Sequence, residues 1–310
     1  KEYYTYTLGT KTNIKTNHLK TPIKNIVVTR TTHIAMFELL EVEQFLTGFP
    51  KTDFISSKKT RKRIDNGKIV DLGNEQSINT EQLIALSPEL VVAFGVNGSN
   101  KAYKTALKNN IPVIYNGDWL EETPLGRAEW IKFFGVLFNK QHKADSIFNT
   151  IEANYLKVKK IAHAANQNKT IFSGSLYKDV WYMPAGNSFM ATYFKDANTN
   201  YLWKNTSGTG SLPLSIESVL DKATNASYWI GCGLFKTKKE LINSNKYYQY
   251  FNAFKQNNTY TYANKRGATG GLIYFENSPV RPDLVLKDII KITNPDLFPD
   301  YTLTFFDKLN

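Results

Sequence analysis

The sequence predicts an α/β protein made of two lobes that are joined by a single long α-helix. Strand-like and helix-like segments alternate along the chain, one central segment keeps helical spacing over a domain's length, and two segments share one design. With 310 residues, of which 42% are hydrophobic, the chain is long enough for two folded units. We expect an N-terminal lobe over residues 1–138, a connecting helix over 139–166 and a C-terminal lobe over 167–310.

Short apolar runs mark the expected strands of both lobes. They cover residues 25–30, 89–94, 111–116, 170–175 and 228–232. After the third run, Asp118 and Trp119 lie on a loop, and Thr123 with Pro124 begins a helix that extends to Phe138. Ligand sites in open α/β sheets collect on loops at the carboxyl ends of strands, so this loop is a candidate ligand contact.

Residues 141–165 form the predicted connecting helix. Apolar side chains keep helical spacing there, and the segment has neither proline nor glycine. At a rise of 1.5 Å per residue it is about 36 Å long, which is the length of a domain. This helix is therefore long enough to brace two lobes.

The two halves of the chain repeat one design, in residues 78–95 and 214–233. Each segment has a capping Asn79 or Ser215, an acid in the first turn, an apolar helix and a strand that ends in glycine. Together with the helix between them, these segments indicate a duplicated lobe.

The net charge of +12 is compatible with a nucleic-acid-binding protein, in which residues 56–68 would form the basic patch. We do not favour it, because the other basic residues are spread over amphipathic segments and no nucleic-acid-binding module is present. The charge can also attract anionic small molecules or a membrane surface.

No run of about 18 apolar residues exists, so no transmembrane span is expected. The first 22 residues lack a signal core, so either the protein is cytoplasmic or a targeting segment was removed.

The sequence contains no recognisable catalytic motif. Residues 208–213 lack the third glycine of a dinucleotide fingerprint, residues 173–175 indicate a glycine turn, and Cys232 is a buried structural thiol. No enzyme activity, cofactor or metal site is expected, since the histidines are scattered and only His33 falls on a ligand-facing loop. The histidines are His18, His33, His142 and His163.

Aromatic and cationic side chains are concentrated on the loops that follow the expected strands. They suggest a large, partly apolar ligand, to which arginines would donate charge-assisted hydrogen bonds. For each aromatic residue alone, packing beneath a loop is the competing interpretation. The candidate ligand contacts are Thr32, His33, Trp119, Arg127, Trp181, Tyr182, Arg266, Tyr274 and Phe275.

Four segments resemble one protein family. They are TPLGRAEWIKFFG (123–135), MPAGNSFMATYFKDANTNYLW (183–203), GSLPLSIESVL (210–220) and RPDLVLKDIIKITNPDLFPDY (281–301). They are similar to the substrate-binding proteins that serve iron-siderophore, haem and cobalamin ABC importers, and most similar to lipid-anchored members in Gram-negative bacteria. The resemblance covers roughly residues 23–309.

This resemblance implies two Rossmann-like lobes joined by a single long α-helix, with the ligand in the cleft between them. It also implies delivery to a membrane permease, for which a separate ATPase subunit supplies the energy. It also implies a periplasmic protein, with membrane association only through a lipid anchor outside this chain. Trp119 would belong to the rim of the N-terminal lobe, and Arg127 would be either a cleft donor or an anchor for its loop.

The chain departs from the family pattern at the expected docking sites. Family members dock through an acidic residue near the tip of each lobe, but residues 96–104 offer lysines and no acid, whereas the C-terminal lobe offers Glu240. Relatives that bind bare zinc or manganese use several histidines, so a bare metal is not expected. We expect a receptor for a ferric siderophore, with cobalamin or haem as the alternative ligand and an α/β hydrolase or chelatase as the competing class.

Overall fold

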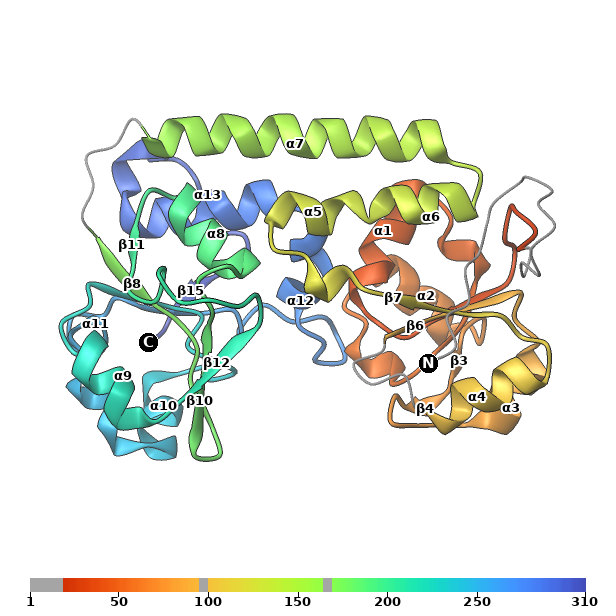
Figure 1. The fold of residues 1–310 in the computed structure, drawn as a ribbon, viewed down its shortest axis with the longest axis horizontal. Helices are drawn as coiled ribbons and strands as arrows, with labels where there is room; N and C mark the ends of the chain where they lie inside the picture. Colours follow the sequence, from red (N-terminus) through yellow and green to blue (C-terminus); the bar gives the residue numbers. More distant parts are fainter. Residues whose placement is uncertain (1–18, 95–99, 164–168) are drawn as a thin grey trace. The chain divides into compact units, whose positions relative to one another are not determined.

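The computed structural model describes residues 19–94, 100–163 and 169–310 as two α/β units (Figure 1). Contacts group the chain up to Thr52, Lys59–Asn116 and Ile131–Asp145 into unit 1. Unit 2 contains Asp53–Lys58, Gly117–Trp130 and Ser146–Asn310. Each unit has its own parallel sheet with helices, which confirms the predicted fold class.

Unit 1 is built on a parallel five-stranded sheet in the order β3-β2-β1-β6-β7. Its strands are β1 (Ile26–Val28), β2 (Leu46–Phe49), β3 (Val70–Asp71), β6 (Leu90–Phe94) and β7 (Val113–Asn116), with a hairpin of β4 (Gly73–Asn74) and β5 (Ser77–Ile78). Its helices are α1 (Thr32–Leu40), η1 (Glu43–Phe45), α2 (Lys58–Asp65), α3 (Thr80–Leu86), α4 (Lys101–Lys108) and α6 (Ile131–Leu137), and η2 (Thr52–Phe54) begins in it.

The core of unit 1 follows from its apolar strands. The β1 and β6 strands are wholly or almost wholly buried, as expected for parallel strands. Phe37 of α1 contacts Phe134 of α6 edge-on, with ring centroids 5.1 Å apart. The expected strands at 25–30, 89–94 and 111–116 are therefore present as β1, β6 and β7.

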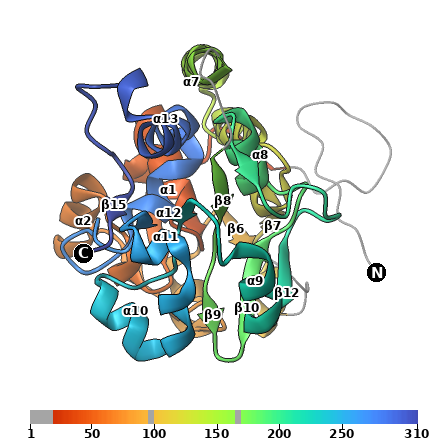
Figure 2. The same ribbon diagram turned by 90° about the vertical axis from the view of Figure 1, so that its left-hand side faces the viewer.

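Unit 2 has a five-stranded sheet in the order β11-β8-β13-β14-β15, of which only β15 is antiparallel to its neighbour. These strands are β8 (Thr170–Phe172), β11 (Asn200–Tyr201), β13 (Tyr228–Ile230), β14 (Thr259–Thr261) and β15 (Asp307–Lys308). A second, antiparallel sheet contains β9 (Leu176–Tyr177), β10 (Val180–Pro184) and β12 (Ser211–Leu214), beside α9 (Figure 2).

The helices of unit 2 surround these sheets. They are η3 (Asp118–Leu120), α5 (Pro124–Glu129), α8 (Phe189–Asp196), α9 (Ile216–Ala223), α10 (Lys238–Ser244), η4 (Lys246–Tyr250), α11 (Asn252–Lys255), α12 (Ile273–Asn277), η5 (Ser278–Val280), α13 (Pro282–Thr293) and η6 (Pro295–Leu297). In the core beneath them, Trp181 and Trp229 lie 5.4 Å apart between ring centroids.

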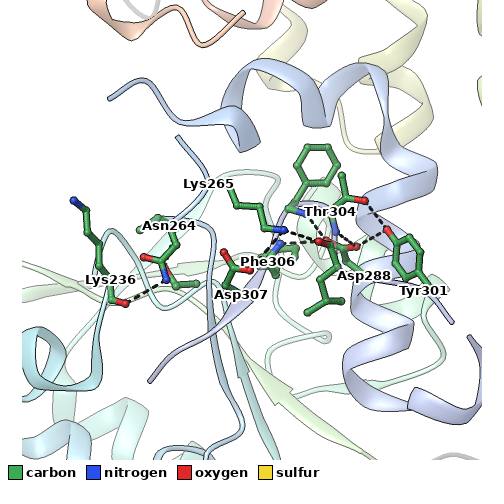
Figure 3. A network of polar contacts seen from close by, with 12 residues as sticks. Lys236, Asn264, Lys265, Asp288, Tyr301, Thr304, Phe306 and Asp307 are labelled. Atoms are coloured by element: carbon green, nitrogen blue, oxygen red, sulfur yellow. Dashed lines mark hydrogen bonds and ion pairs between the residues drawn. The ribbon is translucent and has the colours of Figure 1, made fainter. Parts of the chain in front are cut away.

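A buried carboxylate fixes the last residues of the chain to α13. Asp288 is fully buried and accepts hydrogen bonds from the Tyr301 hydroxyl at 2.6 Å and from the backbone N–H groups of Thr304, Phe305 and Phe306 at 2.9, 2.6 and 3.1 Å (Figure 3). Burial raises the pKa of Asp288, while these bonds oppose the rise. The network orders the segment that leads into β15.

The predicted connecting helix is present as α7 (Gln141–His163), a continuous helix of 23 residues. Its first residues belong to unit 1, and the rest, from Ser146, belong to unit 2. Within unit 2, Asp196 of α8 accepts a hydrogen bond from the Tyr155 hydroxyl at 2.7 Å and forms an ion pair with Lys159 at 2.8 Å. The predicted end of the helix, at 164–165, lies outside the described residues.

The repeated helix starts are also present. Asn79 caps α3 by accepting the Gln82 N–H, and Ser215 caps α9 by accepting the Ser218 N–H. Each helix leads into a parallel strand, β6 or β13.

Two features differ from the sequence predictions. The helix expected from Thr123 to Phe138 is interrupted at Trp130 and forms α5 and α6. The expected lobe boundaries also differ from the contact division, since residues 117–130, expected in the N-terminal lobe, group with unit 2. The reason is that α5 packs on α8, α13 and η5, all of which belong to unit 2. Short residue-level patterns carry no information about such partners.

Candidate functional site

Unit 2 contains a cavity of about 370 Å³ at the carboxyl ends of β8, β13 and β14. In open α/β sheets this edge is where ligands bind. Its walls come from the loops after these strands and from β9 and β10. The lining residues are Gly174, Ser175, Leu176, Tyr177, Tyr182, Gly231, Gly233, Leu234, Phe235 and Tyr262.

Two glycines are required where the loops approach one another. Gly174 has a φ of +77°, and a Cβ there would lie 2.2 Å from the carbonyl oxygen of Tyr182. Gly233 has a φ of +88°, and a Cβ there would lie 2.3 Å from Oγ of Ser175. Both conformations favour glycine, and both approaches exclude a side chain. Small residues therefore form the floor of the cavity.

Two buried indoles hold this floor in place. Trp229 donates from Nε1 to the carbonyl oxygen of Gly174 at 2.8 Å, and Trp181 donates to that of Ser173 at 2.9 Å. The backbone N–H of Leu176 donates to the Tyr248 hydroxyl at 3.0 Å. Buried polar groups need such partners, so the loop after β8 has one well-defined conformation.

An aromatic layer supports the side of the cavity that follows β14. Tyr262 stacks on Tyr274 with ring centroids 4.7 Å apart and planes 13° apart, and Phe275 contacts it edge-on at 5.3 Å. The Tyr274 hydroxyl lies 3.4 Å from Sδ of Met190. Burial raises the pKa of Tyr262 to about 12, so its hydroxyl is neutral at pH 7.

The structure brings several predicted residues close to this cavity. Tyr182 lines it directly and is 45% exposed, while Tyr274 and Phe275 form the layer behind Tyr262. Trp181, by contrast, has no exposed surface, so it cannot contact a ligand in this structure. Trp181 holds the cavity floor through its hydrogen bond to Ser173, and it is a core residue and not a ligand contact.

Arg127 lies in unit 2, on α5, next to aromatic side chains. Its guanidinium carbon is 4.3 Å from the ring centroid of Phe189, and its buried Nε has no hydrogen-bond partner among the described residues. Its positive charge opposes the burial that raises the pKa values of Tyr193 and Tyr274. Trp119 lies in η3 of the same unit and is partly buried.

Arg266 is engaged by its own loop. Its Nε donates to the carbonyl oxygen of Ala263 at 2.7 Å, and its Nη1 donates to that of Gly270 at 2.9 Å. These bonds brace the segment between β14 and α12. The side chain is thus a structural clamp, and it would have to exchange these bonds to bind an anion.

The two predicted contacts of unit 1 lie at the start of α1. Thr32 is its first residue and is partly buried. His33 is fully buried, with its ring 5.0 Å from that of Phe134, so it is not on a ligand-facing surface in this structure. His33 is the second residue of α1, and its side chain packs in the core against Phe134.

Histidines and acids do not cluster in the described parts of the chain. Within residues 19–94, 100–163 and 169–310, no group of three or more His, Cys, Asp or Glu side chains could hold a metal ion. His142 and His163 lie near opposite ends of α7, and His18 lies outside the described residues. Across the same ranges, no helix combines the length and apolar character needed to cross a membrane. Cys232 is a buried free thiol whose pKa burial raises to about 12.

Glu240, the expected docking residue, is exposed on α10 but has a local role. Its Oε2 accepts the backbone N–H of Lys236 at 2.7 Å, and its own N–H donates to Oγ1 of Thr237 at 3.1 Å. Thr237 therefore caps the helix, and the Glu240 carboxylate holds the residue before this cap. Part of the N-lobe docking stretch, residues 96–99, lies outside the described residues.

Sequence reasoning missed most of the cavity lining. The strongest missed residues are Tyr177, Phe235 and Tyr262. A signal was present, because GSLY (174–177) and GLF (233–235) each place a glycine, a leucine and an aromatic residue soon after a buried strand. The repetition of this short pattern marks loops that share one cavity.

Comparisons with known proteins agree with this architecture. Residues 26–265 match a family described as periplasmic binding protein. An uncharacterised lipoprotein of Methanocaldococcus jannaschii is 26% identical over 301 residues, which cover 94% of this chain and 70% of that protein.

Solved structures share the fold at low sequence identity. One is a possible iron-binding, periplasmic solute-binding protein of Staphylococcus epidermidis, with a TM-score of 0.68, 17% identity and coverage of 88% of this chain and 100% of that one. Another is a periplasmic haem-binding protein of Pseudomonas aeruginosa, with a TM-score of 0.68, 12% identity and coverage of 93% and 98%.

Proposed function

This chain belongs to the periplasmic binding protein family, and we propose that it is the substrate-binding component of an ABC importer that captures a ferric siderophore. It would deliver this chelate to a membrane permease, and a separate ATPase subunit would supply the energy. The family match over residues 26–265 is the observation that carries the proposal. Members of this family bind solutes for transport, so we expect capture without chemical conversion.

The cavity of unit 2 supports ligand capture. It lies at the sheet edge where α/β proteins bind ligands, and fixed loops form its floor. Tyr182, with the layer of Tyr274 and Phe275, remains a proposed contact region. His33 and Trp181 are left out because their side chains are fully buried.

Charged groups of the chelate would meet Arg127. A partly buried guanidinium with an unsatisfied Nε gains a charge-assisted bond when an anionic oxygen approaches. Trp119 and Thr32 stay proposed contacts on the basis of their positions after β7 and β1. Arg266 is a weaker candidate, since its donors already serve its own loop.

Cobalamin or haem is the alternative ligand, and the uncharged lining of the cavity is the observation that favours cobalamin, whose amides are neutral, over haem, which carries two propionate carboxylates. Salt separates the ferric chelate from cobalamin. Binding of an anionic ferric chelate should weaken as salt rises, since charges are screened beyond about 8–10 Å near physiological ionic strength. Arg127→Ala should weaken it by about 10-fold to 100-fold. Neutral cobalamin should respond to neither change.

We propose that the protein acts outside the cytoplasmic membrane, in a periplasm or its equivalent, and that a lipid anchor outside this chain attaches it. Its family and the archaeal lipoprotein relative support this location. The relative gives no support to a restriction to Gram-negative bacteria.

Glu240 is our proposed docking residue for the permease, and two variants separate docking from capping. Glu240→Gln keeps an oxygen that can accept the Lys236 N–H, whereas Glu240→Lys does not. Both should lower uptake in a reconstituted importer if the negative charge docks, with ligand affinity unchanged. Loss of uptake in Glu240→Lys alone would assign Glu240 to the cap. Glu217→Gln, on the exposed start of α9, is the control.

The decisive experiment is a binding titration followed by tryptophan fluorescence, with a ferric siderophore, haemin and cyanocobalamin as probes. All five tryptophans lie in unit 2, so a coloured ligand bound there should quench them. We expect saturable quenching by the ferric siderophore, and a matching iron-chelate absorbance band on the loaded protein. Saturable binding of none of the three probes would overturn the proposed function, and preference for haemin or cyanocobalamin would replace its ligand.

A further inference from the structure

We propose that the unit 2 cavity binds an aromatic ring of the ligand and discriminates this ring from a saturated group of similar size. The proposal rests on the proposed function and specifies which part of the chelate the cavity takes. At about 370 Å³ the cavity is at the small end of ligand pockets. It can hold one ring system with its substituents, and the remainder of a chelate must lie outside it.

The chemistry of the walls selects against a charged group. The ten lining residues comprise three tyrosines, one phenylalanine, two leucines, three glycines and one serine. None carries a formal charge at pH 7. A carboxylate or ammonium group placed there would lose water without gaining an ionic partner, which is costly. A neutral ring loses little on entering and gains contact with four aromatic side chains.

The aromatic walls combine one fixed ring with two open ones. Tyr262 is held between Tyr274 and Phe275, so it loses little conformational freedom when a ligand arrives. Tyr177 and Tyr182 are 67% and 45% exposed, although both are large apolar-bodied side chains. Ring surface of this kind is what a second ring covers in a stacked or edge-on pair.

A neighbouring cation does not change this selectivity. Nζ of Lys178 lies 5.9 Å from the Tyr177 ring centroid, but Lys178 does not line the cavity. Its ammonium group is directed to the Tyr177 ring, and the Lys178 side chain is not part of the cavity lining. Lys178→Gln is therefore a matched control next to the residues under test.

The test uses three iron(III) tris(hydroxamate) complexes, prepared from benzohydroxamate, cyclohexanecarbohydroxamate and acetohydroxamate. All three are neutral and share one iron coordination, so only the aryl, saturated-ring or methyl group differs. Tryptophan quenching in the full chain reports binding. We expect the aryl complex to bind about threefold to tenfold more tightly than the saturated-ring complex, as aromatic pairing predicts. Tyr182→Leu and Tyr177→Leu should bring this ratio towards one, and Lys178→Gln should preserve it.

The outcomes distinguish this proposal from the proposed function. Equal or weaker binding of the aryl complex, with a ferric siderophore still bound, overturns the ring proposal alone. The same holds if a siderophore binds and none of the three hydroxamate complexes does. A ratio unchanged by both tyrosine variants, with folding intact by circular dichroism, also overturns it. If no ferric siderophore, haemin or cyanocobalamin binds, both proposals fail.

Discussion

The two main sheets differ in what lies at the edge where their parallel strands end. In unit 1, the buried Thr29 after β1 accepts the Phe94 N–H at 2.9 Å and donates to Glu75 at 3.4 Å. In unit 2, the equivalent loops after β8 and β13 contain Gly174 and Gly233 and border a cavity. The carboxyl edge of the sheet therefore holds a polar network in one unit and an open aromatic cavity in the other. Glycine at positions 174 and 233 lets the loops around the cavity approach one another closely.

The tryptophans make this comparison measurable. All five lie in unit 2, so tryptophan fluorescence follows that unit alone, while far-UV circular dichroism follows both. A substitution in either unit can thus be assigned by comparing the two signals. Different midpoints would also show that the units do not unfold in one two-state step.

The largest effect is expected for Asp288→Ala in unit 2. It removes the acceptor of four hydrogen bonds and leaves three backbone N–H groups without that acceptor, two of them on the buried Phe305 and Phe306. The free energy of unfolding should fall by about 3–4 kcal/mol, measured by urea titration with tryptophan fluorescence. Asp300→Ala, at an exposed position, is the control and should change it by less than about 0.5 kcal/mol. Equal effects of the two variants would contradict the role of this network.

Gly174→Ala tests whether close approach, beyond positive φ, shapes the cavity floor. We expect a loss of about 2–3 kcal/mol of unfolding free energy, because the new Cβ would collide with the Tyr182 carbonyl oxygen. Gly208→Ala has a φ of +96° but no atom closer than 3.8 Å to the new Cβ. Gly208→Ala therefore measures only the cost of placing alanine at a positive φ, which should be about 1 kcal/mol of unfolding free energy. If both variants lose the same amount, the collision is relieved by movement of β10.

Thr29→Val addresses the filled edge of unit 1. It preserves shape but removes the hydroxyl that accepts the Phe94 N–H. The expected loss is about 1–2 kcal/mol in the circular dichroism transition, with the tryptophan midpoint unchanged. An equal shift in both signals would mean that the two units unfold together, and the comparison between them would then need ligand binding as its readout.

The smallest effect concerns pH and Asp71 of unit 1. Burial alone would raise the Asp71 pKa, but hydrogen bonds from the Thr52 side chain and the N–H groups of Gly73 and Thr52 lower it overall. Its contribution is therefore present above the usual value of 3.8 and is lost as pH falls through the lowered pKa. It should stay below about 1 kcal/mol, since Asp71 is exposed to solvent.

Urea titrations of wild type and Asp71→Asn at pH 6 and pH 3 check this contribution. The variant should be less stable than wild type at pH 6, and the difference should be smaller at pH 3, which lies below the usual value of 3.8. A constant difference at both pH values would show that the ionised carboxylate does not contribute.

Local sequence patterns predicted the elements well and the site less well. Cap residues Asn79 and Ser215, the Thr123–Pro124 helix start and the uninterrupted α7 follow from backbone hydrogen bonding within a few residues. Tyr182 was found through its loop, but Trp181 beside it proved to be core. In a strand, neighbouring side chains point to opposite faces, and a one-residue difference decides between cavity and core.

By itself, the sequence determined the α/β alternation, the long connecting helix and the family, because periodicity, capping and characteristic segments are written in consecutive residues. The tertiary structure decided that residues 117–130 join unit 2, that the Arg266 guanidinium is used by its own loop, and that Tyr177, Phe235 and Tyr262 share a cavity. These results depend on which distant segments pack together. Burial and partnership are properties of that packing, and no short stretch of residues encodes them alone.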